Sequence, residues 1–179
     1  MDAACIAAIP AIGPLAASVP IEDIVAQRAQ TPEWKQINEM DRLIAECPQV
    51  HMPLLHTFTP NLYARSIYIP AGTIATTLIH RHEHPFVISM GEVSVWTDEG
   101  RWERLCASHI GVTKQGTRRV LYAHTDVIWH TFHVTNETDP NKLVDELTFD
   151  PVKLGHLDDL SPDQLAALRE HAKPTNLLP

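Results

Sequence analysis

A closely spaced set of histidines between two turns constrains the fold of this chain more than any other feature. The stretch 70–91, PAGTIATTLIHRHEHPFVISMG, places His80, His82 and His84 at every second position. Side chains two residues apart lie on one face of a strand, so this spacing predicts an extended segment that presents several imidazoles together. Gly91 predicts a tight turn after this segment. The sequence therefore predicts short strands that reverse direction around the histidines.

Strand patterns on both sides of the histidines extend this prediction to a meander of antiparallel strands. Residues 62–69 mix β-branched and aromatic side chains in loose alternation, which predicts a strand before the cluster. Further segments have strand character after it: residues 86–89, 93–96, 104–113, 118–123 and 127–134, with a hairpin turn at 98–100. The fold class expected from these patterns is mainly β.

The histidines predict a metal site, because imidazole is the commonest metal ligand in proteins. In the last predicted strand His133 shares a face with Trp129, and His130 lies on the opposite face; the periodicity does not decide which face points inward. The candidate ligands are His80, His82, His84 and His133. The alternative is a polar strand end whose histidines bond to carbonyls and water. The cofactor is therefore either none or a divalent transition metal such as iron, nickel, manganese or zinc.

Two stretches of the chain resemble the two motifs of the cupin superfamily. The run PAGTIATTLIHRHEHPFVISMGEVSVW resembles the first motif, GX5HXHX3-4EX6G. Anchored on the final glycine, His84 stands where the family has its glutamate, and counting from the first glycine places Leu78 and His80 at the family's two histidines. The run GVTKQGTRRVLYAHTDVIWHTFHV is similar to the second motif, GX5PXGX2HX3N, with Arg119 in the place of its histidine.

The resemblance implies a cupin-type fold, a double-sheet antiparallel β-barrel that is jelly-roll-like. The succession of strands and turns along the chain is similar to that of small single-domain cupins of bacteria and phages, with degenerate metal motifs. A guanidinium does not give up its proton at ordinary pH, so Arg119 cannot ligate a cation. If Arg119 enters the barrel, its charge opposes a metal there or favours an anion.

The remaining sequence predicts an arm and two helical extensions around this barrel. Residues 1–20 form an apolar arm rich in proline and alanine, residues 21–59 a helical N-terminal extension, residues 60–137 the barrel, and residues 138–179 a C-terminal helical extension. Thr31 is a good N-cap for a helix in the first extension, whose apolar face should pack outside the barrel. Two short helices, at 138–147 and 161–171, are expected in the second extension.

Composition excludes several classes of protein. The formal net charge is -8 and the basic clusters are small, so no nucleic-acid partner is expected. The apolar start has no basic residue before Arg28 and is interrupted by prolines, so neither a secretion signal nor a membrane span is expected. The three cysteines follow no metal or disulfide spacing. The expected location is the cytoplasm, or a virion if the chain is phage-encoded.

These patterns favour a structural or assembly protein with a cupin fold, for example a phage virion or assembly component. The apolar arm needs cover, so residues 3–19 are expected to bind neighbouring subunits, and the resemblance implies a homo-oligomer. Two alternatives stay open. The first is a metal-dependent cupin enzyme of the dioxygenase or isomerase type, and the second is a non-catalytic sugar-binding or sensory cupin.

Overall fold

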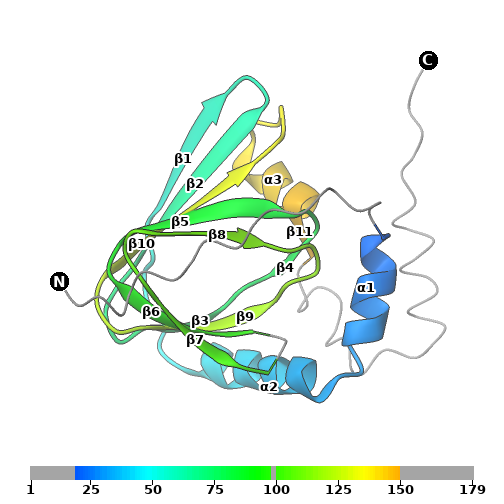
Figure 1. The fold of residues 1–179 in the computed structure, drawn as a ribbon, viewed down its shortest axis with the longest axis vertical. Helices are drawn as coiled ribbons and strands as arrows, with labels where there is room; N and C mark the ends of the chain where they lie inside the picture. The colour runs from blue at the N-terminus through cyan, green and yellow to red at the C-terminus, as the bar shows by residue number, and fades with distance from the viewer. Residues whose placement is uncertain (1–18, 98–99, 150–179) are drawn as a thin grey trace.

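Two antiparallel sheets face each other in the computed structural model of this chain, which describes residues 19–97 and 100–149 (Figure 1). The larger sheet has the strand order β1-β2-β10-β5-β8. Its strands are β1 (Leu54–Thr59), β2 (Leu62–Ile69), β10 (Val127–His133), β5 (His84–Met90) and β8 (His109–Thr113). All neighbouring strands in this sheet pair antiparallel, as the meander prediction requires.

The second sheet has the order β3-β9-β6-β7, and a separate two-stranded pair joins β4 to β11. These strands are β3 (Ile74–Thr76), β9 (Arg119–Ala123), β6 (Glu92–Thr97), β7 (Trp102–Cys106), β4 (Ile79–His80) and β11 (Thr148–Phe149). The three pairings within the four-stranded sheet are antiparallel. The predicted mainly β, double-sheet architecture is confirmed.

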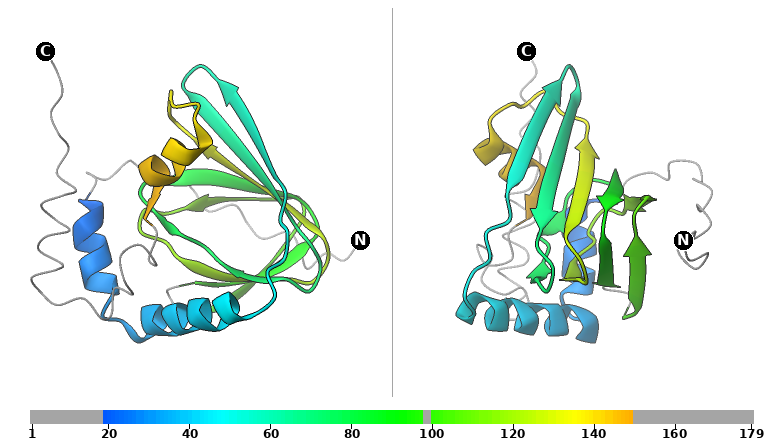
Figure 2. Two further views of the ribbon diagram at one scale, coloured as in Figure 1. Left: turned by 180° about the vertical axis from the view of Figure 1, so that it is seen from behind. Right: turned by 90° about the vertical axis from the view of Figure 1, so that its left-hand side faces the viewer.

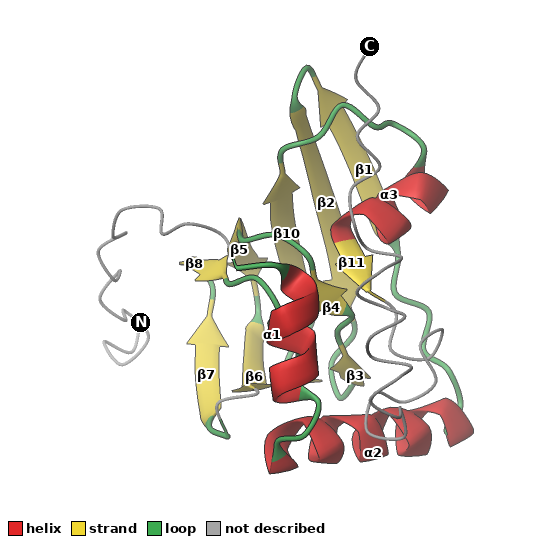
Figure 3. Cartoon of the chain, turned by 90° about the vertical axis from the view of Figure 1, so that its right-hand side faces the viewer, coloured by secondary structure: helices red, strands yellow, loops and turns green. Residues whose placement is uncertain are grey.

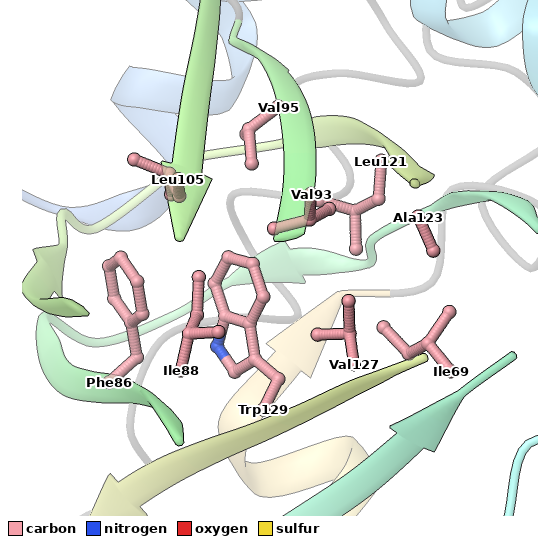
Figure 4. Close-up of a cluster of buried hydrophobic side chains, with 10 residues drawn as sticks. All are labelled: Ile69, Phe86, Ile88, Val93, Val95, Leu105, Leu121, Ala123, Val127 and Trp129. Atoms are coloured by element: carbon pink, nitrogen blue, oxygen red, sulfur yellow. The ribbon is translucent and has the colours of Figure 1, made fainter. Parts of the chain in front are cut away.

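The main hydrophobic core lies between the two sheets (Figure 4). It consists of inward-facing side chains from six strands: Ile69, Phe86, Ile88, Val93, Val95, Leu105, Leu121, Ala123, Val127 and Trp129. Alternation along β6 puts Val93 and Val95 inside, as expected for a strand with one buried face. The core fills one end of the barrel with apolar side chains, whereas the other end carries the histidines described below.

Among the described residues, three helices lie outside the sheets: α1 (Ile21–Arg28), α2 (Pro32–Glu46) and α3 (Pro140–Leu147). The Thr31 side chain accepts a hydrogen bond from the backbone N–H of Trp34, which confirms the predicted N-cap. Figures 2 and 3 show α2 along the outside of the smaller sheet, where the sequence predicted it. The α3 helix packs Leu143 and Leu147 against Tyr63 of β2.

A buried charge fixes α2 to the barrel. Arg118 is completely buried next to β9, and its guanidinium pairs with the carboxylate of Asp41 and donates to the side-chain carbonyl of Asn38, both on α2. Asp41 also accepts a hydrogen bond from the Thr76 hydroxyl on β3. Because a buried guanidinium needs compensating partners, this contact makes the position of α2 specific.

The structure differs from the expected element boundaries at two places. The first barrel strand, β1, begins at Leu54, inside the range 21–59 that the sequence assigned to a helical extension. Its proline-interrupted start hid the strand, which pairs with β2 over its whole length. The segment before the histidines is two short strands, β3 and β4, because residues 77–78 break the ladder.

Several predictions fall outside the described residues. These are the arm at residues 1–18, the helix at 161–171 and most of the hairpin turn at 98–100. Cys47 is a free, exposed cysteine. The predicted cytoplasmic location stays a prediction. No helix in the described part of the chain has the length and apolar character needed to cross a membrane.

Candidate functional site

Three histidines meet where β4, β5 and β10 come together. The ring centroids of His80 and His84 are 4.5 Å apart in an edge-on arrangement, and those of His84 and His133 are 4.3 Å apart. His80 ends β4, His84 begins β5 and His133 ends β10, so the three rings converge from strand ends. His133 is thus the inward-facing histidine of the last strand, and it is buried.

The structure does not bring His82 into this group. Residues 81–83 are not part of a strand, and residues 81–82 form a bend between β4 and β5, so the strand alternation that would align the three histidines is interrupted there. The His82 side chain is exposed as a result. Within residues 19–97 and 100–149, no three or more His, Cys, Asp or Glu side chains are arranged as a group that could hold a metal ion. The three rings pack on one another instead.

Hydrogen bonding fixes the tautomer of His84. Its Nδ1 lies 3.0 Å from the backbone carbonyl oxygen of His82, and a carbonyl only accepts, so Nδ1 carries the proton and donates. The other nitrogen, Nε2, therefore has a free lone pair. It is buried and has no hydrogen-bond partner among the described residues, and the same is true of Nδ1 of His80. Unsatisfied buried polar atoms are uncommon and call for an explanation.

A pocket of about 80 Å³ opens beside the histidines, between the inner face of the larger sheet and α3. In Figure 1 α3 lies beside the β1–β2 end of this sheet. The lining side chains come from β1, β2, β4, β10 and the α3 region: Leu54, His56, Tyr63, Arg65, Leu78, His80, Thr131, His133, Pro140, Leu143, Val144, Leu147 and Thr148. One wall is therefore polar and basic, and the opposite wall is apolar.

Strand register places the polar wall in two rows across the sheet. Arg65 of β2 pairs with His56 of β1 and with Thr131 of β10. Two residues along β2, Tyr63 pairs with His133 of β10. Side chains at paired positions share a face, so both rows point into the pocket. The hydroxyl of Tyr63 is 2.7 Å from Nδ1 of His56, which orients both rings.

Burial makes all three clustered histidines hard to protonate. It lowers the pKa of His80 well below the usual 6.5, and the neighbouring His84 and Arg119 lower it further. Burial lowers the pKa of His84 to about 4, and the guanidiniums of Arg119 and Arg65 act in the same direction. For His133, burial followed by repulsion from His84 lowers the pKa to about 3. The three imidazoles are consequently neutral at neutral pH.

Arg119, which stands at the position of the missing motif histidine, lies inside the barrel. Its side chain is buried, and Nη1 donates a 2.8 Å hydrogen bond to the Thr113 hydroxyl. Its guanidinium carbon lies 5.4 Å from the ring centre of Phe86 and 6.0 Å from that of Trp129. The sequence analysis expected an Arg119 side chain inside the barrel to oppose a metal or favour an anion, and the structure places the side chain there.

Sequence reasoning missed Arg65 and Tyr63. Their signal was present in the strand LYARSIYI, where Tyr63 and Arg65 occupy the same alternating face as Ile67 and Ile69. Since Ile69 belongs to the core, alternation alone places an arginine on the inward face two positions from an isoleucine. An inward arginine on a core strand is unusual and indicates a polar site.

The chemistry of this site suits two kinds of guest. Neutral imidazoles can ligate a transition metal, so His80, His84 and His133 suit a metal by donor type, although the three side chains are not arranged as a metal-holding group in the described structure. When bound, such a metal would supply Lewis acidity. The second kind of guest is an anion, since the guanidinium of Arg65 lines the pocket and none of the described residues that line it is Asp or Glu.

No known protein family matches the chain by sequence, and no curated protein matches it either. Solved structures with a similar fold include cupins. The cupin domain of Cnp3 from Schizosaccharomyces pombe is 15% identical, with a TM-score of 0.41, 56% of this chain covered and 70% of that one. Ectoine synthase from P. lautus is 12% identical, with a TM-score of 0.47 and coverages of 60% and 84%.

A third similar structure is a cupin domain of an XRE family transcriptional regulator from Enterobacter cloacae. It is 17% identical, with a TM-score of 0.40, 48% of this chain covered and 98% of that one. Such likenesses concern the fold alone. The two packed antiparallel sheets that the two motifs implied are confirmed by the strand pairing.

Proposed function

We propose that the protein binds a small organic molecule in the pocket between the larger sheet and α3. The observation that carries this proposal is a pocket of about 80 Å³ lined by His80 and His133, and the buried Nδ1 of His80 has no hydrogen-bond partner in the described part of the chain. A structural core satisfies or excludes such groups, whereas a binding site keeps them for its ligand. Among the functions expected from the sequence, this proposal is nearest to the non-catalytic sugar-binding or sensory cupin, with a small organic molecule in place of a sugar.

Filling the pocket tests the proposal. Leu54 lines the pocket and its neighbour Leu55 does not, although both belong to β1 and are exposed at 48% and 64%. We expect Leu54→Trp to abolish binding of small molecules detected in a ligand-observed NMR fragment screen, because the indole occupies the pocket mouth. Leu55→Trp is the matched control and should bind as the unchanged protein does. Binding that survives Leu54→Trp would place the ligand elsewhere.

A metal at His80, His84 and His133 is the second candidate function. The unpaired nitrogens of His80 and His84 favour it, and the buried charge of Arg119 opposes it. Elemental analysis of protein purified without a histidine tag tests it directly. With a metal, His84→Ala should lose the ion and His82→Ala should keep it, because the His82 side chain is exposed. Equal metal content in both variants would reject these ligands.

The assembly role predicted from the sequence stays a prediction, because most of the arm at 3–19 lies outside the described residues. Exposed apolar side chains on the two edge strands favour self-association: Leu55 on β1 and Ile110 on β8 are 64% and 54% exposed. Sedimentation of the full chain and of a chain lacking residues 1–20 tests this role. We expect the shortened chain to stay folded and to lose its assembly.

A further inference from the structure

We propose that the ligand of this pocket is a small organic carboxylate that binds the Arg65 guanidinium and packs its apolar part against α3. This inference rests on the proposed function, because it names the chemical class of the molecule that the pocket binds. Three features of the described residues carry it. They are the state of the Arg65 side chain, the charge of the pocket lining, and the apolar wall opposite.

Arg65 lacks a counter-charge in the described part of the chain. No hydrogen bond or ion pair joins its guanidinium to another described residue, and burial lowers its pKa. A guanidinium nevertheless stays charged at ordinary pH. A charge removed from water without a partner is costly, so an anion that pairs with Arg65 gains more here than at the surface.

The charged side chains that line the pocket favour a ligand with a single negative charge. The formal net charge of the chain is -8, yet the described residues that line the pocket include Arg65 and histidines and no Asp or Glu. Arg119 already donates to Thr113. One available guanidinium fork matches one carboxylate, which it can bind through two parallel hydrogen bonds.

The wall formed by α3 favours a ligand whose part beyond the carboxylate is apolar. Leu143, Val144 and Leu147 of α3 line the pocket together with Leu54. A water-sized group needs about 10–15 Å³ of such volume, so 80 Å³ holds roughly five to eight of them. A carboxylate with a chain of about four to six carbons fits this volume. Inorganic phosphate would leave the apolar wall without a contact.

Three probes of equal chain length separate charge from shape in isothermal titration of the full-length protein. They are hexanoate, hexanamide and hexylamine. We expect hexanoate to bind at least about 10-fold more tightly than hexanamide, because hydrogen bonds to charged groups are stronger than neutral ones. Hexylamine should not bind detectably, since its cation meets Arg65. Inorganic phosphate should bind more weakly than hexanoate.

Two pairs of variants test the contacts. Arg65→Met should weaken hexanoate binding about 10- to 100-fold, whereas Arg101→Met, at an exposed arginine, should leave it unchanged. Val144 lines the pocket and is 42% exposed, so changes there should be tolerated in the fold. Val144→Glu should weaken hexanoate binding and Val144→Gln should not. This second pair keeps the test decisive if Arg65→Met fails to fold.

The outcomes distinguish this inference from the proposed function. If hexanamide or hexylamine binds as tightly as hexanoate, or if Val144→Glu and Val144→Gln bind hexanoate equally, the carboxylate class is wrong and the pocket remains a binding site. If phosphate binds more tightly than hexanoate, the ligand is an anion without an apolar part, which also overturns the inference. If no probe binds and the fragment screen finds no ligand, the proposed function itself fails.

Discussion

The buried histidines make a definite prediction about stability in mild acid. His84 is only 3% exposed, and its pKa is lowered to about 4 in the folded protein, against 6.5 for a free side chain. Between these two values the unfolded chain binds a proton at His84 that the folded chain does not. The free energy of unfolding must therefore fall as the pH falls from 6.5 towards 4.

The size of this effect follows from the two pKa values. One pKa unit corresponds to about 1.4 kcal/mol, so the penalty from His84 alone reaches about 2 kcal/mol on going from pH 7 to pH 5. His133, with a pKa of about 3, should add to the loss in the same window. Because the two rings are in contact, the two contributions are not additive.

Urea denaturation at pH 7, 6 and 5 measures this loss in the unchanged protein and in His84→Gln. We expect the free energy of unfolding of the unchanged protein to fall by about 2 kcal/mol or more, and that of His84→Gln to fall less steeply, since the ring that titrates is gone. Stopping at pH 5 keeps most carboxylates charged. His82→Gln, at an exposed histidine, should follow the unchanged protein. Identical pH slopes for His84→Gln and the unchanged protein would refute the reasoning.

Two further predictions concern the scaffold. Asp41→Ala removes a charged partner of the fully buried Arg118, so urea denaturation should show that the free energy of unfolding falls by roughly 3–5 kcal/mol. Glu39→Ala, on the exposed face of α2, should lower it by no more than about 0.5 kcal/mol. Equal losses of stability in the two variants would contradict the role of the buried pair. Gly91→Ala places a Cβ against a backbone carbonyl at φ +87°, and Gly72→Ala has a similar φ of +79° but open space. Both should lower the melting temperature, and Gly91→Ala should lower it more, because only that change adds a collision; equal shifts would show that the collision is relieved.

Local patterns in the sequence determined most of the secondary structure. Strand β2 begins and ends where the alternation of LYARSIYI predicted, and Thr31 caps α2 as expected. Gly91 adopts the positive φ that its turn required. These features depend on a few neighbouring residues, so the sequence alone specifies them. Strand β1 was missed because its stability comes from pairing with β2, which is a tertiary contact.

The candidate site depended on both the sequence pattern and the tertiary structure. The sequence identified His80, His84 and His133, and the fold brought these three together from separate strand ends. It also suggested His82, which the bend at 81–82 leaves exposed, because period-two spacing aligns side chains only while the strand continues. Arg65 and the wall of α3 reach the pocket through strand register and helix packing. Such neighbours are distant in sequence, so only the tertiary structure decides that a basic wall and an apolar wall face each other.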